Sequence, residues 1–220
     1  MESTINNRSK GIVSNLHEYT FHILGCGAIG SAAAMQLVRM GAEEFLLYDF
    51  DRVSEENIGV SQYTINYIHL PKVKALSSHM KAINPKANIT AMANRFDVFE
   101  YTGKEKNVMI LAFDSMDSRR DAVEKALKTK HKPWLLIDGR MGAEHYQQYT
   151  LLNPELRDYM KTWYTDADGS PEPCNAKATA YCSNMSGSFI ANQVRKALTD
   201  TPIDKEFFFN FPTLTLARRG

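Results

Sequence analysis

FHILGCGAIGSAAAMQLVRMGAEEFLLYDFD, residues 21–51, is the stretch that decides the fold of this chain. An apolar run leads into Gly25, Gly27 and Gly30, and a helical pattern then separates it from a second apolar run that ends at Asp49. In such a loop the first glycine permits a tight turn, the second lets the backbone approach a phosphate, and the third allows close helix–strand packing. An acidic residue after the second strand is placed to accept ribose hydroxyls. The stretch therefore predicts a strand–loop–helix–strand unit that binds a nucleotide.

The composition is that of an ordinary globular protein. The 220 residues suffice for one sizeable domain, and 26 Lys and Arg against 25 Asp and Glu give no electrostatic reason to expect nucleic acid. No apolar run reaches the roughly 20 residues that span a bilayer, so we expect no membrane segment. The N-terminal stretch lacks an apolar signal-peptide core, and the three cysteines are too few for a disulfide framework. We therefore expect a cytoplasmic protein.

Strand and helix patterns alternate along most of the chain. We expect strands at 20–25, 44–50, 88–96, 107–114, 133–142 and 146–153, and helices at 28–40, 70–85, 118–130 and 182–198. This alternation predicts an α/β fold, Rossmann-like, in which a mostly parallel sheet carries helices on both faces.

One domain over residues 1–220 is the simplest division of the chain. We expect a nucleotide-binding half at about 20–125 and a substrate and loop half at about 126–220. Within the second half, residues 153–180 are polar, irregular and rich in proline. This stretch is too long for an ordinary connection, so we interpret it as a functional loop.

The residues that follow Asp49 favour ATP over NAD. Asp51 and Asn57 continue the polar stretch, and Lys72 opens the next predicted helix. A lysine at a helix N-terminus opposes the helix dipole unless an anion binds there too. Asp114 ends the fourth predicted strand. A lysine for phosphates and an aspartate for a divalent metal suit a triphosphate with Mg²⁺, whereas a dehydrogenase needs neither.

These motifs resemble those of the ThiF/MoeB/ubiquitin-activating-enzyme superfamily. The similar segments are GCGAIG, YDFDRVSEEN, PKVKAL with INP, and LAFDSMDSRR. The resemblance covers residues 20–125 and, more faintly, 134–198. Members of this family bind ATP·Mg and adenylate the C-terminal carboxylate of a ubiquitin-like protein, releasing pyrophosphate. The resemblance therefore implies that the partner is a ubiquitin-like or sulfur-carrier protein with a C-terminal Gly, or a peptide. It also implies a homodimer.

The same resemblance assigns roles residue by residue. It gives nucleotide contacts to Gly25, Gly27, Gly30, Asp49, Asp51, Asn57, Lys72 and Arg119. Asp49 would hold the ribose, and Asn57 and Lys72 the phosphates. Asp114 matches the metal-binding aspartate of the family, and Asp117 is the alternative metal ligand.

The chain departs from the family pattern at one position. The family continues its asparagine as N-L-x-R-Q, whereas this chain reads NIGVSQ, with Val60 in place of the arginine. A missing arginine can cost several orders of magnitude in phosphoryl chemistry. Arg8, Arg119 and Arg140 are candidate replacements. Family dimers often lend an N-terminal arginine across the interface, as Arg8 could, although a surface arginine is an equally good interpretation.

Cys174 is the candidate nucleophile. Several family members pass the acyl group to a cysteine just before the last helix, and Cys174 lies at about that place. Cys182 opens the predicted helix and we expect it to be buried, while Cys26 would pack under the glycine loop. Two alternatives to an active adenylating enzyme remain. One is a non-catalytic ATP-binding subunit, which Val60 would explain, and the other is an NAD-dependent oxidoreductase, which only the glycine motif supports.

Overall fold

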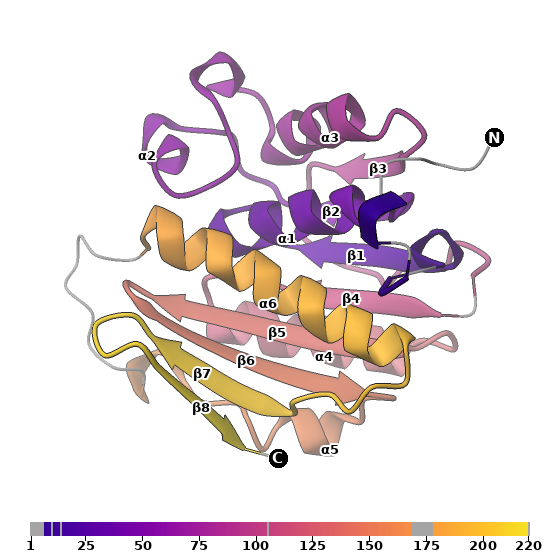
Figure 1. Ribbon diagram of the computed structural model, residues 1–220, viewed down its shortest axis with the longest axis vertical. Helices are drawn as coiled ribbons and strands as arrows, with labels where there is room; N and C mark the ends of the chain where they lie inside the picture. Colours follow the sequence, from indigo (N-terminus) through magenta and orange to yellow (C-terminus); the bar gives the residue numbers. More distant parts are fainter. Residues whose placement is uncertain (1–6, 10, 14, 105, 169–177, 220) are drawn as a thin grey trace.

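A single eight-stranded sheet organises the molecule. The computed structural model describes residues 7–9, 11–13, 15–104, 106–168 and 178–219. The strands follow the order β3-β2-β1-β4-β5-β6-β7-β8 (Figure 1). Their bounds are β1 Thr20–Leu24, β2 Glu44–Tyr48, β3 Asn88–Met92, β4 Asn107–Leu111, β5 Leu135–Gly142, β6 His145–Leu152, β7 Glu206–Asn210 and β8 Thr215–Arg219.

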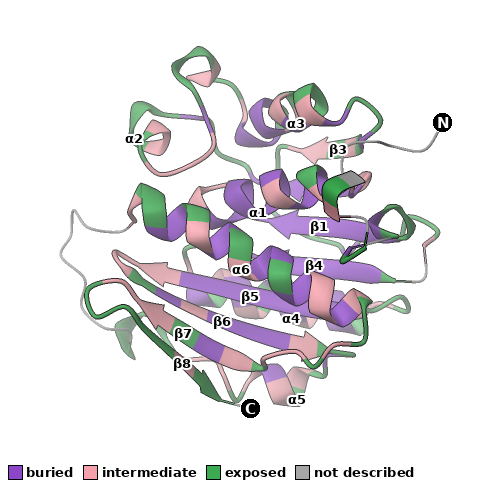
Figure 2. Cartoon of the chain, viewed as in Figure 1, coloured by how far each residue is buried: buried purple, intermediate pink, exposed green. Residues whose placement is uncertain are grey.

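The sheet has a parallel half and an antiparallel half. Strands β3, β2, β1, β4 and β5 pair in parallel, and β6, β7 and β8 then continue the sheet in antiparallel pairs. Every residue of β1 and β4 is buried, as expected for parallel strands with helices on both faces. Figure 2 shows this buried centre and, in contrast, the exposed edge strand β8.

Helices cover both faces of the sheet. The bounds are α1 Ala28–Arg39, α2 Glu55–Ile58, α3 Lys72–Ile83, α4 Met116–Lys128, α5 Leu156–Tyr159 and α6 Ala180–Leu198. Helices α1, α3 and α6 contribute to one hydrophobic cluster, and α4 contributes to the second, smaller one. Short 3₁₀ turns occupy residues 7–9, 16–18, 65–67 and 166–168. No helix in the described part of the chain has the length and apolar composition needed to cross a membrane.

Close packing of α6 on α1 fixes the larger layer of helices. The two helices meet at Gly187, where an added Cβ would lie 2.6 Å from the carbonyl carbon of Ala32 and 2.9 Å from its side chain. Residues of both helices also line the sheet beneath them, including Ile29, Leu37, Ile190 and Val194. A small residue at the crossing point therefore lets α6 lie directly beside the helix that follows the glycine loop.

The structure confirms the predicted α/β fold. The predicted strands and helices in residues 20–198 all form, most of them with slightly shorter bounds than predicted. The hairpin of β7 and β8 was not predicted. Within the stretch 153–180, the described residues form α5 and the turn at 166–168, and residues 169–177 lie outside the described part.

Candidate functional site

The predicted site residues gather where three neighbouring strands end. The glycine loop follows β1, Asp49 follows β2, and Asp114 comes shortly after the end of β4. Strand β1 lies between β2 and β4. The chain leaves β1 for one face of the sheet through α1 and leaves β4 for the other face through α4 (Figure 1). Such a switch point at the carboxyl ends of strands is where open α/β sheets bind ligands.

Each glycine of the loop has a distinct structural reason. Gly25 has a φ of +92°, and a Cβ there would lie 2.7 Å from the carbonyl oxygen of Ala112, at the end of β4. A Cβ on Gly30 would lie 1.8 Å from the carbonyl oxygen of Gly25, so only glycine allows α1 to begin so close to the loop. Among the residues that the structure describes, none has an atom within 4 Å of the Cβ position of Gly27, which is the N-cap of α1. The backbone is thus open to a ligand at Gly27 and closed at the other two glycines.

Asp49 ties the glycine loop to the end of β2. Its Oδ2 accepts a hydrogen bond of 2.7 Å from the backbone N–H of Cys26, and its Oδ1 accepts one of 2.8 Å from the backbone N–H of Asp51. Burial raises the pKa of the Asp49 carboxyl, while Lys72 and the two backbone N–H groups oppose that rise. Each carboxylate oxygen retains a further lone pair, so the residue can also accept from a ribose hydroxyl.

Lys72 lies at the start of α3 with its charge already paired. Its Nζ lies 2.8 Å from Oδ2 of Asp51, and its side chain is 11% exposed against 50% for Asp51. Asp51 is half-exposed, so solvent screening limits what the pair contributes to stability. An anionic phosphate can therefore compete with Asp51 for the ammonium group at small cost.

Tyr63 is a member of this site that the sequence did not reveal. Its hydroxyl donates to the carbonyl of Cys26, in the glycine loop, and lies 3.3 Å from the carbonyl of Lys72. The residue is 4% exposed and connects the loop after β1 with the first residue of α3. A tyrosine in the polar stretch after Asn57 is the only feature that could have suggested it.

Asn57 and Val60 lie in the segment between β2 and α3. The Oδ1 atom of Asn57 accepts from the backbone N–H of Ser54 at 3.0 Å, which forms a capping box on α2. Val60 is half-buried, and Gln62 continues the segment by bonding Ser31 of α1 and Asn184 of α6. The segment is therefore fastened to both helices, and no charged group stands at position 60.

Asp114 is exposed in the turn between β4 and α4. Asp117, the alternative metal ligand, is also exposed and lies 3.2 Å from Arg120 in an ion pair. Among the residues that the structure describes, no three His, Cys, Asp or Glu side chains are grouped to hold a metal ion. Mg²⁺ with a nucleotide needs only one or two carboxylates, since phosphate oxygens and water complete its ligands. The exposed Asp114 fits that requirement.

Two of the three candidate arginines are engaged inside the protein. Arg119 donates to the carboxylate of Asp138 and to the carbonyl of Phe113, and its side chain is 4% exposed. Arg140 donates to Asp138 at 2.7 and 3.0 Å. Burial lowers the pKa of Arg140, but the Asp138 carboxylate more than offsets this effect and raises it overall. Both guanidinium groups therefore face a common internal carboxylate.

Arg8 is exposed in the turn at residues 7–9. This N-terminal segment lies at the amino ends of the strands, opposite the glycine loop (Figure 1). Arg8 therefore does not lie at the candidate site of its own chain.

The cysteines differ in what the structure says of them. Cys174 lies outside the described residues, so its role remains a prediction. Cys26 and Cys182 are both buried. Burial, followed by the nearby Asp49 carboxylate, raises the pKa of the Cys26 thiol, and burial raises that of Cys182 to about 11. Neither is a reactive thiolate, in agreement with the expectation that both pack inside the protein.

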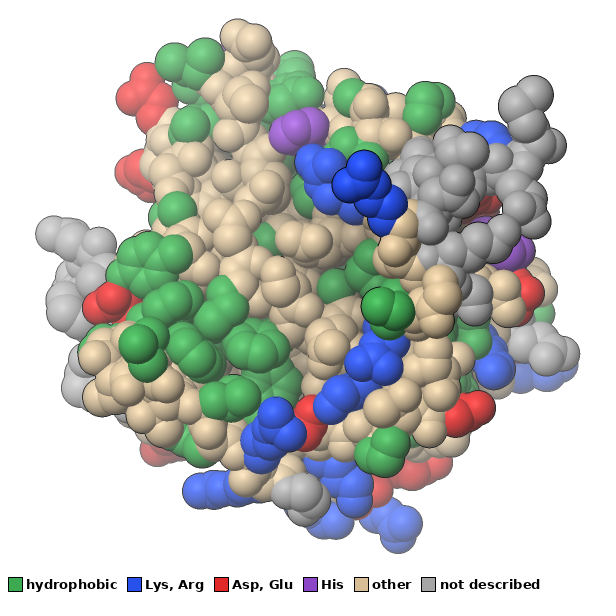
Figure 3. Space-filling model, in the orientation of Figure 1, with side chains coloured by type: hydrophobic (Ala, Val, Ile, Leu, Met, Phe, Trp, Pro, Cys, Tyr) green, Lys and Arg blue, Asp and Glu red, His purple; other side chains and the backbone are tan. Residues whose placement is uncertain are grey.

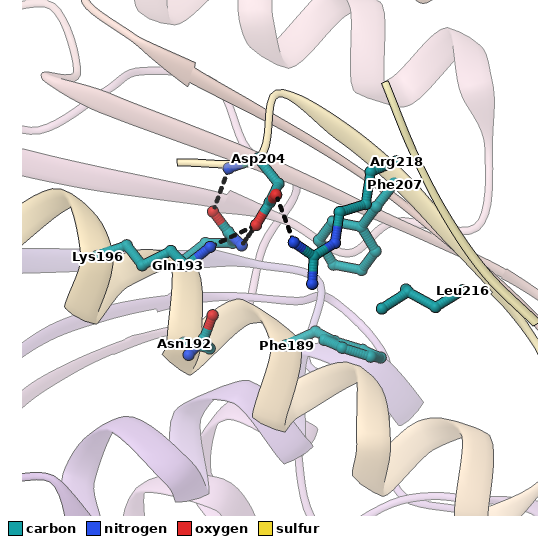
Figure 4. A pocket seen from close by; sticks show the side chains of 8 residues that line it. All are labelled: Phe189, Asn192, Gln193, Lys196, Asp204, Phe207, Leu216 and Arg218. Carbon is teal, nitrogen blue, oxygen red and sulfur yellow. Dashed lines mark hydrogen bonds and ion pairs between the residues drawn. The ribbon is translucent and has the colours of Figure 1, made fainter. Parts of the chain in front are cut away.

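A cavity of about 240 Å³ lies elsewhere, between α6 and the β7–β8 hairpin. Figure 4 shows Asp204 there between Lys196 of α6 and Arg218 of β8. The carboxylate accepts from Lys196 at 2.6 Å and lies 3.7 Å from Arg218. None of its lining residues belongs to the candidate site. The charged residues that line the cavity pair with one another, and these pairs join the hairpin to α6.

Known proteins of similar sequence include activating enzymes of ubiquitin-like modifiers. The chain is 26% identical over 156 residues to the ubiquitin-like modifier-activating enzyme 5 of Oryza sativa subsp. japonica, covering 70% of this chain and 34% of that protein. It is 29% identical over 142 residues to the enzyme of the same name from Caenorhabditis elegans, covering 57% of this chain and 33% of that one. The chain thus spans about a third of the length of these curated relatives.

Solved structures share the fold. E. coli MccB, crystallised with ATP, superposes with a TM-score of 0.71 at 13% identity, covering all of this chain and 72% of that one. PaaA superposes with a TM-score of 0.70 at 17% identity, covering 93% and 64%. The model of the ThiF family matches residues 4–219, nearly the whole sequence. With the glycine loop, Lys72 and Asp114 brought to one edge of the sheet, the chain belongs to the ThiF family.

Proposed function

We propose that this chain binds ATP with Mg²⁺ and adenylates the C-terminal carboxylate of a ubiquitin-like protein, a sulfur-carrier protein or a peptide. The observation that carries the proposal is the meeting of three features at one switch point: the open backbone at Gly27, the ammonium of Lys72 and the exposed carboxylate of Asp114. The family and the names of its relatives support the same reaction class.

Binding would use the described residues as follows. Phosphate groups approach the backbone at Gly27, where the first turn of α1 directs its N–H groups outward and its dipole favours an anion. Asp49 accepts from the ribose, and Lys72 leaves Asp51 for a phosphate. Mg²⁺ held at Asp114 would neutralise negative charge on the phosphates.

In the reaction, an oxygen of the partner's terminal carboxylate forms a bond to the α-phosphorus of ATP. The bond from that phosphorus to the bridging oxygen breaks, and pyrophosphate leaves with the electron pair. A carboxylate is already ionised near neutral pH, so no general base is required. The protein contributes position and neutralisation of charge. Where the acyl group moves on to a sulfur of this protein, Cys174 is our candidate acceptor.

Val60 supports a second candidate function, a non-catalytic ATP-binding subunit. No arginine stands at that position, and Arg119 and Arg140 are both bound to Asp138. Such a subunit would bind ATP without forming an acyl-adenylate.

ATP–pyrophosphate exchange distinguishes the two functions. The wild-type chain is tested with a Gly-ended ubiquitin-like protein and with a short peptide that has a free C-terminal carboxylate, and Asp114→Ala serves as the comparison. We expect exchange that depends on one of these carboxylates and is lost in Asp114→Ala. ATP binding without exchange for any carboxylate would favour the non-catalytic subunit, and exchange that is unchanged in the variant would refute the role of Asp114.

A further inference from the structure

A buried carboxylate on β5 joins the turn of Asp114 to the segment after α5. Asp138 is fully buried and accepts from Arg119, from Arg140 at 2.7 Å and from the hydroxyl of Tyr159 at 3.2 Å. Buried charges persist only when they are paired and hydrogen-bonded. Two guanidinium groups that share one carboxylate therefore have their positions fixed by β5.

Arg119 connects Asp138 to the backbone next to Asp114. One of its terminal nitrogens donates to Asp138 and the other donates to the carbonyl of Phe113, the residue that directly precedes Asp114. A guanidinium group is a rigid planar fork, so the two bonds cannot move independently. The direction of the peptide before Asp114 is therefore set by the carboxylate on β5.

The segment after α5 holds the same turn from its other side. Arg140 donates to the carbonyl of Thr162 at 2.8 Å, which fastens this segment to β5. Oδ1 of Asp166 then accepts from the backbone N–H of Met116 at 3.0 Å, and Nε1 of Trp163 donates to the carbonyl of Met116 at 2.9 Å. The first residue of α4 is thus bonded through both its N–H and its carbonyl to a segment about 50 residues later in the chain.

We propose that Asp138 and Arg119 are positioning residues for Asp114, and that docking of residues 156–168 on Met116 is coupled to metal–nucleotide binding at Asp114. The inference rests on the proposed function. The bond of Arg119 to Phe113 holds the turn of Asp114 on one side, and the bonds of residues 163 and 166 to Met116 hold it on the other. A ligand that requires one orientation of the Asp114 carboxylate therefore stabilises residues 156–168 in their docked position. By reciprocity, the docked segment raises metal-dependent affinity by the same factor.

The test compares ATP affinity with Mg²⁺ and with EDTA by calorimetry. Trp163→Phe and Asp166→Ala each remove one bond to Met116 without touching the buried charges. Asp168→Ala is the matched control: it removes one carboxylate from the same segment, and among the described residues that carboxylate accepts its hydrogen bonds from Thr165 and not from Met116. We expect the gain in affinity due to Mg²⁺ to fall about fivefold or more in the first two variants, as for coupled sites generally, and to be unchanged in the control.

Hydrogen exchange supplies a second readout, independent of activity. Exchange of residues 156–168 should slow when ATP and Mg²⁺ bind to the wild-type chain, and should not respond in Asp114→Ala. If Trp163→Phe and Asp166→Ala both keep the gain in ATP affinity that Mg²⁺ gives the wild-type chain, the coupling is refuted and the proposed function is not. If the wild-type chain binds ATP equally well with Mg²⁺ and with EDTA, both the coupling and the proposed function are refuted. Asp138→Asn would not decide between these outcomes, because it leaves two buried guanidinium groups without a carboxylate.

Discussion

Single residues decide whether the nucleotide loop can form. Gly25 and Gly30 are enclosed by backbone atoms, whereas no atom of the described part of the chain crowds the Cβ position of Gly27. The sequence pattern predicted these glycines as one motif, but it could not separate the two that the fold needs from the one that leaves room for a ligand. That distinction depends on where Ala112 and the end of β4 lie, which no local pattern contains.

Substitution of the glycines by alanine separates folding from binding. Gly30→Ala should lower the free energy of unfolding by at least about 1–3 kcal/mol, because its Cβ meets the carbonyl of Gly25. Gly27→Ala should cost less, no more than about 1 kcal/mol because alanine is a poorer N-cap than glycine, yet weaken ATP binding by placing a methyl group where the phosphates approach. Urea denaturation and calorimetry measure the two effects. Equal loss of stability in both variants would be inconsistent with this account.

His22 is a buried residue that makes stability depend on pH. It lies within β1, with ring nitrogens 3.1 Å from Oδ1 of Asn107 and 3.3 Å from the hydroxyl of Tyr48. Burial lowers its pKa from 6.5 to about 4, although the Asn107 bond acts in the opposite direction. The folded-state pKa is below the unfolded value, so the unfolded chain binds more protons between these two pH values. The stabilisation is therefore present above pH 6.5 and is lost as the pH falls toward 4.

His22→Gln should flatten this dependence. Between pH 6.5 and 4 the titration of His22 can remove up to about 3 kcal/mol from the free energy of unfolding. Urea denaturation at several pH values measures the difference in slope between the wild type and the variant. His17→Gln, on an exposed histidine, is the control and should keep the wild-type slope. A variant at position 22 with the wild-type slope would assign the acid sensitivity to other groups.

At the scale of whole elements, the parallel half of the sheet was predictable and the C-terminal hairpin was not. Apolar runs that end in Gly or Asp mark β1, β2 and β4 directly. In β7, three consecutive phenylalanines give no alternation, although the structure buries Phe207 and leaves Phe208 43% exposed. The turn before β8 uses Leu214 at a φ of +51° and has no glycine to announce it. These strands form because β6 and α6 offer a surface, which is tertiary information.

The hydrogen bonds of Asp138 on β5 with Arg119 and Arg140 also could not be predicted from the sequence. An aspartate inside the apolar run LLIDGR was the one available hint, because a charge in a buried strand needs a partner. Nothing local indicated that Arg119 and Arg140 would both supply it. Both arginines were instead predicted as candidate replacements for the arginine that is missing at position 60.

The contact of α1 with α6 yields a prediction at this scale. Helix propensity alone would make alanine about 1 kcal/mol better than glycine within α6. At Gly187, however, a Cβ would lie 2.6 Å from the backbone of α1, and backbone cannot move aside as a flexible side chain can. Gly187→Ala should therefore destabilise the chain by about 1–3 kcal/mol in chemical denaturation. Ser188→Ala, at an exposed neighbour, is the control, and a stabilised Gly187→Ala would contradict the packing argument.

At the scale of the molecule, the surface is divided between charge and apolar groups. Figure 3 shows hydrophobic side chains gathered over the start of α6 and the turn of the β7–β8 hairpin, with Lys and Arg beside them. The patch includes Tyr181, Leu214 and Leu216, which are 48%, 75% and 41% exposed. Single exposed apolar residues need no explanation, whereas a contiguous group of them is typical of interaction surfaces.

A homodimer would explain how the chain functions without an arginine at position 60. The turn at residues 7–9, which contains Arg8, lies at the amino ends of the strands (Figure 1), so Arg8 would have to serve the site of a second copy. We expect Arg8→Ala and Asp114→Ala each to lose ATP–pyrophosphate exchange. A mixture of the two should regain part of it, because a mixed dimer has one site with both residues. Two inactive variants that remain inactive after mixing and subunit exchange would exclude this arrangement.

The central claim is that the site at the switch point binds ATP with a metal held by Asp114. Calorimetric titration of the wild type and of Asp114→Ala, with ATP and Mg²⁺ beside NAD, tests it most directly. We predict that ATP binds in a metal-dependent manner, that the variant loses this binding, and that NAD does not bind. Binding of NAD but not of ATP would contradict the account.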